Sequence, residues 1–102
     1  MLSLLRAEEY DRSLRDLWVV LEKDSGNADA RTMLTTAYYN KGVISLQQGK
    51  PDEAQDNLKE AAGLMPGDVD VERLLQFAQT YQQRNPDLLY RIYTKYLTPR
   101  PL

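Results

Sequence analysis

Apolar residues recur along the chain every three or four positions, the spacing that places them on one face of an α-helix. Five stretches show this spacing: residues 10–23, 28–48, 51–64, 69–83 and 86–97. The pattern therefore predicts an all-α protein of about five helices. Residues 1–6 are too few to form a helix by themselves, and the prolines within residues 98–102 prevent the last helix from continuing.

The apolar side chains of these stretches define the predicted core. They are Leu14, Leu17, Val20 and Leu21 in the first stretch, Ala30, Met33, Leu34, Ala37 and Tyr38 in the second, Ala54, Leu58, Ala61 and Ala62 in the third, Val71, Leu74, Leu75, Ala78 and Tyr81 in the fourth, and Leu88, Leu89, Ile92, Tyr93 and Tyr96 in the fifth. Because the tyrosines Tyr38, Tyr81, Tyr93 and Tyr96 lie on these stripes, we expect them to pack in the core.

The residues between the stretches are those that begin and end helices. Asn27 and Asp68 precede the second and fourth stretches and are expected to be N-caps. Gly49 ends the second stretch, and Pro51 takes the first position of the third. Asn85 is expected to cap the fifth stretch, which would then begin at residue 86.

Gly42 lies inside the second predicted helix, where glycine costs up to about 1 kcal/mol relative to alanine. A position that merely tolerates glycine is one explanation. A close helix crossing is the better one, because only a missing Cβ lets two helix backbones approach there.

Residues 37–68 contain two of the predicted helices, joined by a short turn and closed by Pro-Gly-Asp. The positions that carry a known repeat pattern are occupied by Tyr38, Lys41, Gly42, Ser45, Ala54, Leu58 and Pro66. The segment therefore resembles a tetratricopeptide repeat. The resemblance implies an antiparallel helix-pair solenoid that binds partners and is not a catalyst.

The resemblance extends to about two and a half repeats. Residues 10–23 look like the second helix of an earlier repeat, because Ser13 precedes its counterpart Ala54 by 41 residues. The family period is about 34, and the excess predicts an elongated helix over residues 28–48. We expect residues 1–102 to form one tetratricopeptide-like domain. The half repeat at its start is cut from a longer protein, capped by residues 1–6, or covered by a second chain.

The resemblance also implies a groove, lined by the helices at 28–48 and 69–83, for a peptide or helix of a partner protein. The matching residues of the complete repeat are Tyr39, Asn40, Val43, Leu46 and Gln47. In the last repeat Arg73 faces the groove, with Gln76 or Phe77 beside it, because the register there is open by one residue.

Two of these groove residues have a further possible role. One subfamily binds a peptide carboxylate through a clamp of Lys, Asn and Arg, and Asn40 and Arg73 match two of its positions. The first-repeat Lys and Asn of the clamp have no counterpart here. A solvated polar residue on the inner face is the simpler interpretation of Asn40.

A structural self-association module is the alternative function. In it, the incomplete first repeat and the elongated helix would pair with a second copy in a homodimer and bury Met33, Leu34 and Trp18. Trp18 either covers the extension at Met33 and Leu34 or anchors a partner.

Composition restricts the function more than the fold. Apolar residues at 42% and charged residues at 27% are typical of a globular domain. The net charge of −2 favours neither nucleic acid nor membrane binding, and no apolar run is long enough for direct membrane insertion. The chain has no Cys and no His, which removes thiolate and imidazole nucleophiles, the usual histidine bases and the common kinds of zinc site. We therefore expect that the protein is not an enzyme and binds no cofactor or metal. The absence of cysteine also fits a cytoplasmic location, which we expect.

Overall fold

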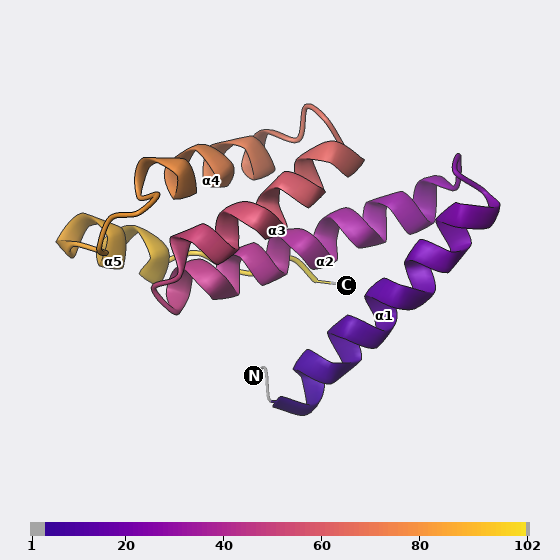
Figure 1. Ribbon diagram of the computed structural model, residues 1–102, viewed down its shortest axis with the longest axis horizontal. Helices are drawn as coiled ribbons and strands as arrows, with labels where there is room; N and C mark the ends of the chain where they lie inside the picture. Colours follow the sequence, from indigo (N-terminus) through magenta and orange to yellow (C-terminus); the bar gives the residue numbers. More distant parts are fainter. Residues whose placement is uncertain (1–3, 102) are drawn as a thin grey trace.

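A computed structural model describes residues 4–101 of the chain, with side chains from residue 11 onward. Its helices are α1 (Leu4–Lys23), α2 (Ala28–Gln47), α3 (Pro51–Leu64), α4 (Val69–Thr80) and α5 (Leu88–Lys95) (Figure 1). Residues 4–101 contain no β-strand, so the predicted all-α class with five helices is confirmed. The predicted length of α2 is confirmed to within one residue.

The first helix is longer than predicted. It begins at Leu4 rather than at residue 10. Residues 4–9 do not need to nucleate a helix, because extending an existing helix costs far less than starting one. The prediction for residues 1–6 was therefore wrong from Leu4 onward, and its remainder lies outside the described residues.

The boundaries of the last two helices were also wrong. α4 ends at Thr80 rather than at residue 83, and α5 spans Leu88–Lys95 rather than 86–97. The N-cap of α5 is Asp87, not Asn85. The Asp87 carboxylate accepts hydrogen bonds from the Tyr90 backbone N–H at 2.9 Å and from the Tyr81 hydroxyl at 2.6 Å. The second bond joins the end of α4 to the start of α5, and the local pattern gives no sign of it.

The other helix ends follow the predicted chemistry. Asn27 accepts a hydrogen bond from the Ala30 N–H, and Asp68 accepts from two N–H groups at the start of α4. Gly49 has a positive φ of 76° directly after the C-cap of α2. The Gly49 N–H donates to the Leu46 carbonyl and the next N–H donates to the Ser45 carbonyl, which is the Schellman arrangement.

The predicted close crossing at Gly42 is confirmed. A Cβ on Gly42 would lie 2.7 Å from Cγ and 2.8 Å from Cδ2 of Leu58. The neighbour is the Leu58 side chain of α3, not a backbone atom as the prediction supposed. Leu58 is completely buried, so α3 lies against α2 because Gly42 leaves room for it.

Two hydrophobic clusters hold the helices together. The larger one joins α2, α3, α4 and Tyr90 of α5, around Val43, Leu58 and Leu74. The smaller one joins α1 to the first half of α2, around Leu14, Leu21 and Leu34. Helices α2, α3 and α4 run antiparallel in sequence order, and α1 diverges from α2 beyond the turn that joins them (Figure 1).

Helix α5 packs mainly against α2. Its buried residues are Tyr90 and Thr94. Most of the predicted stripe of this helix faces outward instead, and the prediction of its burial was wrong there: Leu88, Leu89, Ile92 and Tyr96 are exposed by 63%, 72%, 50% and 75%. The reason is that α5 inserts Tyr90 between α2 and α4 and so turns the apolar stripe away from the core. Tyr93 is 36% exposed and stacks on Phe77.

Candidate functional site

The predicted groove residues of α2 lie together, but the chain itself covers them. Tyr39, Asn40, Val43 and Leu46 are buried. Helix α5 and the segment that follows it, residues 97–101, contact this face at Tyr39, Asn40, Leu46 and Gln47. We call residues 97–101 the terminal segment. The interpretation of Asn40 as a solvated polar residue is therefore wrong, because its side chain has no exposed surface.

Asn40 binds the backbone of the terminal segment at two points. Its Nδ2 donates to the Arg100 carbonyl at 2.7 Å, and its Oδ1 accepts from the Arg100 N–H at 2.6 Å. One side-chain amide thus pairs with both polar backbone groups of one residue, as a neighbouring β-strand would. This contact holds a chain in an extended conformation, whatever the side chain at that position.

Gln47 makes a similar contact about two turns further along α2. Its Nε2 donates to the Thr94 carbonyl at 3.1 Å and to the Leu97 carbonyl at 2.9 Å. The two carbonyls lie at the end of α5, where helical partners are missing. Gln47 therefore fixes the point at which the terminal segment leaves α5 and enters the face of α2.

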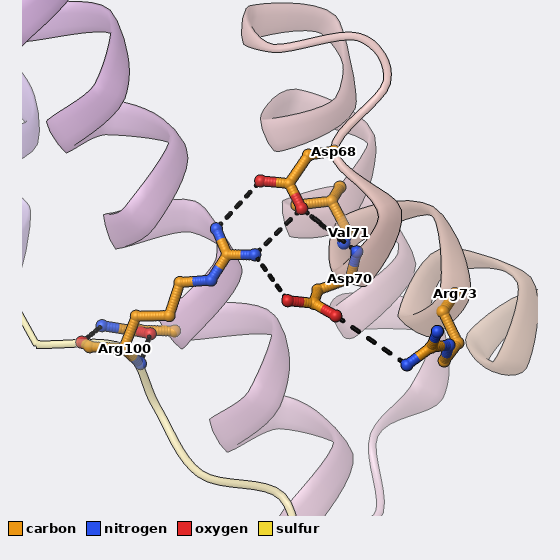
Figure 2. A network of polar contacts seen from close by, with 6 residues as sticks. Asp68, Asp70, Val71, Arg73 and Arg100 are labelled. Atoms are coloured by element: carbon orange, nitrogen blue, oxygen red, sulfur yellow. Dashed lines mark hydrogen bonds and ion pairs between the residues drawn. The ribbon is translucent and has the colours of Figure 1, made fainter.

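The side chain of Arg100 lies between α2 and the start of α4 (Figure 2). Its Nη1 and Nη2 donate to the two Asp68 oxygens at 3.0 and 2.9 Å, and Nη2 also lies 3.2 Å from Asp70 Oδ2. The guanidinium carbon is 4.2 Å from the centre of the Tyr39 ring. Planar guanidinium groups favour this two-point pairing with carboxylate and stacking on aromatic faces.

Tyr39, Asp68 and Asp70 surround the Arg100 guanidinium, and we call their arrangement the acidic pocket. Asp68 and Arg100 shift each other's pKa values. Hydrogen bonding to Arg100 lowers the pKa of Asp68, against the opposing effect of burial, and the N–H groups of Val71 and Asp70 lower it further. The same hydrogen bond raises the pKa of Arg100. Burial raises the pKa of Tyr39, although the nearby guanidinium opposes the rise. The pocket therefore keeps a negative carboxylate opposite a positive guanidinium.

Asp68 both caps α4 and binds Arg100. Its Oδ1 accepts the N–H groups of Asp70 and Val71 at 3.1 and 3.2 Å, which caps α4. The same carboxylate faces Arg100. An N-cap carboxylate is already stabilised by the helix N-terminus, so the negative charge is held in place by α4 itself.

Arg73 lies at the rim of this pocket. Its side chain is 64% exposed and its Nη1 is 3.8 Å from Asp70 Oδ1. Figure 2 shows that Arg73 and Arg100 approach Asp70 from opposite sides. Here Asn40 contacts a peptide group rather than a terminal carboxylate, so the clamp interpretation gains no support from these contacts.

Phe77 is covered by aromatic rings. Its ring centre is 4.2 Å from that of Tyr93 in a stacked arrangement, 5.4 Å from Tyr90 and 5.2 Å from Tyr81. The Tyr90 hydroxyl donates to the Leu46 carbonyl at 2.7 Å, and burial raises the pKa of Tyr90 to about 12. These contacts seat α5 across α2 and α4.

The residues predicted for self-association lie between α1 and α2. Leu34 is completely buried, while Met33 is 46% exposed. Trp18 is half-buried and its Nε1 donates to the Tyr38 hydroxyl at 3.0 Å. The elongated part of α2 is thus covered by α1 of the same chain. Val20, predicted in the core, is 39% exposed, because α1 turns Leu14, Leu17 and Leu21 toward α2.

The described residues offer neither a metal-binding cluster of acidic side chains nor a membrane-spanning helix. Among residues 11–101, whose side chains the structure describes, no group of three or more Asp or Glu side chains is placed to bind a metal ion. Among the described helices, none is long and apolar enough to cross a membrane. Near the α2–α3 turn, Glu53 accepts from the Ser45 hydroxyl and Asp52 accepts from the Gln83 N–H, so both carboxylates have structural contacts.

Sequence reasoning missed the acidic pocket and the residue that fills it. The local pattern presents Asp68 only as a cap, and Arg100 as one of many surface charges. The pairing joins residues 32 positions apart, and no local pattern records it. The one available signal is the sequence Pro99-Arg100-Pro101, which favours an extended chain.

Comparisons of the chain with protein-family models, curated proteins and solved structures give no match. Membership of the tetratricopeptide repeat family therefore stays a prediction, based on the pattern in residues 37–68. Conclusions about function depend on the contacts described above.

Proposed function

We propose that this chain is a non-catalytic protein-interaction module that binds an extended segment of a partner protein along the inner faces of α2 and α4. One observation supports this above all. The same face already holds an extended segment, residues 97–101, through contacts that a separate peptide would make equally well.

The backbone contacts make this surface suitable for peptides. Asn40 pairs with an N–H and a carbonyl of one residue, and Gln47 donates to two carbonyls. Such contacts provide affinity without requiring particular side chains, while pockets for alternate side chains provide specificity. The pocket formed by Asp68 and Tyr39 would provide such side-chain specificity.

The tetratricopeptide resemblance supports the same face. In that family the first helices of the repeats line the binding groove, and α2 and α4 are the corresponding helices here. We include the helix-pair solenoid in the proposal for α1 to α4. Helix α5, expected to complete the last repeat, packs mainly against α2 instead, and we propose that it and the terminal segment occupy the groove face.

Selection from a peptide-display library against the full chain tests the proposal. We expect selected peptides to bind in trans. In the Arg100→Ala chain, whose own terminal segment is held less tightly, we expect Asn40→Ala to weaken them by about tenfold, the equivalent of ~1.4 kcal/mol. Asn57→Ala is the matched control, because Asn57 lies on α3 and its side chain donates only within that helix, to Glu53 O. Circular dichroism of both variants verifies the fold. Peptides that bind equally well to both variants, or a library that yields no binder, would refute the proposal.

A homodimer is the second candidate function. Val19, Val20 and Met33 remain exposed on α1 and α2 by 47%, 39% and 46%, and exposed apolar side chains of this kind occur at protein interfaces. Sedimentation over a concentration series measures it directly. A monomer at high micromolar concentration would exclude this candidate.

A further inference from the structure

We infer that Tyr39, Asn40, Asp68 and Asp70 form a subsite for an arginine in an extended segment of a partner protein, and that Arg100 occupies this subsite in cis. The inference rests on the proposed function and adds the chemical class of the ligand. It also makes the terminal segment a built-in competitor of that ligand.

The geometry of the subsite selects arginine over lysine. Asp68 receives two parallel N–H donors at 2.9 and 3.0 Å, and the guanidinium carbon lies 4.2 Å from the Tyr39 ring centre. A lysine ammonium is a compact point charge without the planar fork, so it cannot donate to both Asp68 oxygens and stack on the ring in the same way. Exchange of Arg for Lys therefore loses contacts while the charge stays.

The subsite also needs a cation to fill it. Asp68 is only 15% exposed at its side chain, and the more exposed Asp70 lies beside it on the same helix start. Arg100 Nη2 donates to both carboxylates, so removal of the guanidinium leaves Asp68 and Asp70 close to each other without a cation between them. Like charges at short separation repel. When Arg100 leaves, the pocket therefore favours another arginine.

The backbone contacts set the shape of the ligand. Asn40 pairs with both polar backbone groups of the residue that carries the guanidinium. Thr98 and Arg100 each precede a proline, and a residue before proline is restricted to extended conformations. The terminal segment is thus preorganised for the face, which lowers the entropy cost of docking. The expected ligand is an arginine within a proline-flanked or otherwise extended segment.

The terminal segment competes because it is tethered. A segment on a short linker acts at an effective concentration in the millimolar range. A partner with the same contacts must exceed that value, so partner binding is weak until Arg100 is displaced. The segment makes no contribution to the hydrophobic clusters beyond Leu97, and its departure therefore leaves α1 to α4 intact.

Peptide titration of the full chain and of its Arg100→Ala variant tests this inference. The probe is the acetylated and amidated peptide Leu-Thr-Pro-Arg-Pro, with lysine and alanine versions at the arginine position. We expect the arginine peptide to bind the variant at least about tenfold more tightly than it binds the unchanged chain, as expected for release of a tethered competitor. We expect a similar preference for the arginine peptide over the lysine peptide.

Two further substitutions in the Arg100→Ala chain locate the binding. Asp68→Asn keeps a side chain that caps helices well but removes the charge, and we expect it to weaken the arginine peptide by about tenfold. Asp56→Asn makes the same charge change on the exposed face of α3, and we expect it to leave binding unchanged. Circular dichroism and urea unfolding confirm that each variant is folded.

The outcomes separate this inference from the proposed function. Equal binding of the arginine and lysine peptides, or equal effects of Asp68→Asn and Asp56→Asn, overturns the arginine subsite and leaves the interaction module standing. If none of the three peptides binds while library-selected peptides still require Asn40, the inference alone fails. If no peptide of either kind binds, both fail. A concentration-dependent dimer of the unchanged chain that Arg100→Ala abolishes would also overturn occupation in cis.

Discussion

Replacement of Gly42 by alanine introduces a methyl group at the closest contact between α2 and α3. The added Cβ would lie 2.7, 2.8 and 3.4 Å from Cγ, Cδ2 and Cδ1 of Leu58. Two of these distances are far below van der Waals contact. Leu58 has no exposed surface into which it can move, so either its side chain leaves its rotamer or α3 shifts away from α2.

Two opposing contributions determine the size of the effect. Overpacking of a filled core costs about 1–3 kcal/mol. Alanine in place of glycine inside a helix contributes up to about 1 kcal/mol of stability. Because two Leu58 carbons are contacted at once, we expect the upper part of the packing cost and a net loss of ~1–2 kcal/mol in the free energy of unfolding.

Gly63 in α3 provides the matched control. A Cβ on Gly63 would meet no atom within 4 Å, so Gly63→Ala contributes only its helix propensity. Since Gly63 lies next to the end of α3, we expect a gain of ~0.5 kcal/mol. The same chemical change therefore has opposite signs at two positions.

Urea unfolding, followed by circular dichroism, measures the free energy of unfolding of both variants. In thermal unfolding, a change of 1 kcal/mol corresponds to about 4–8 °C in Tm for a domain of this size. The double variant with Leu58→Ala is the critical measurement. Removal of the Leu58 branch makes room for the new methyl, so Gly42→Ala should cost much less in that background. A Gly42→Ala protein as stable as the unchanged chain would refute the reasoning that Gly42 sets the helix approach.

Three further predictions concern the polar contacts. Asn40→Ala should lower the free energy of unfolding by about 1–2 kcal/mol in urea titrations, because the paired N–H and carbonyl of Arg100 lose their partner. The pKa of Asp68 is lowered from its ordinary value of 3.8, so the ionised carboxylate stabilises the fold at pH values above 3.8, and this stabilisation is lost as the pH falls through the lowered pKa. Asp68→Asn should therefore reduce the loss of stability that is measured below pH 4. The Tyr90 pKa, raised from 10.0 to about 12, gives stability that is present below pH 10 and lost as pH rises toward 12, and Tyr90→Phe should remove this alkaline dependence as followed by circular dichroism.

The inner face of α2 and α4 has features of a binding surface that is already occupied. Asn40 is buried and hydrogen-bonds to the backbone of Arg100, 60 positions later in the chain. Gln47 hydrogen-bonds to the backbone carbonyls of Thr94 and Leu97, 47 and 50 positions later. Residues that would be interpreted as an open groove from their spacing are thus satisfied internally. Under the proposed function, a partner must displace the terminal segment to bind this face, and affinity measurements on the unchanged chain would then underestimate the strength of the site.

The sequence by itself determined the helices and most of their ends. Apolar spacing predicted α2 and α3 almost to the residue, and the caps at Asn27 and Asp68 formed as expected, because these features depend on residues within one or two turns of each other. Gly42 also indicated the close approach of α3. The repeat pattern likewise grouped Tyr39 to Gln47 on one face of α2.

Only the tertiary structure decided what lies on that face. The local pattern of α5 pointed its apolar stripe inward, yet Tyr90 is the residue that entered the core, because its ring and hydroxyl meet Phe77 and the Leu46 carbonyl. Arg100 fills the acidic pocket because α5 directs the terminal segment back along α2. Both outcomes depend on contacts between residues far apart in the chain, whose energies no local spacing records.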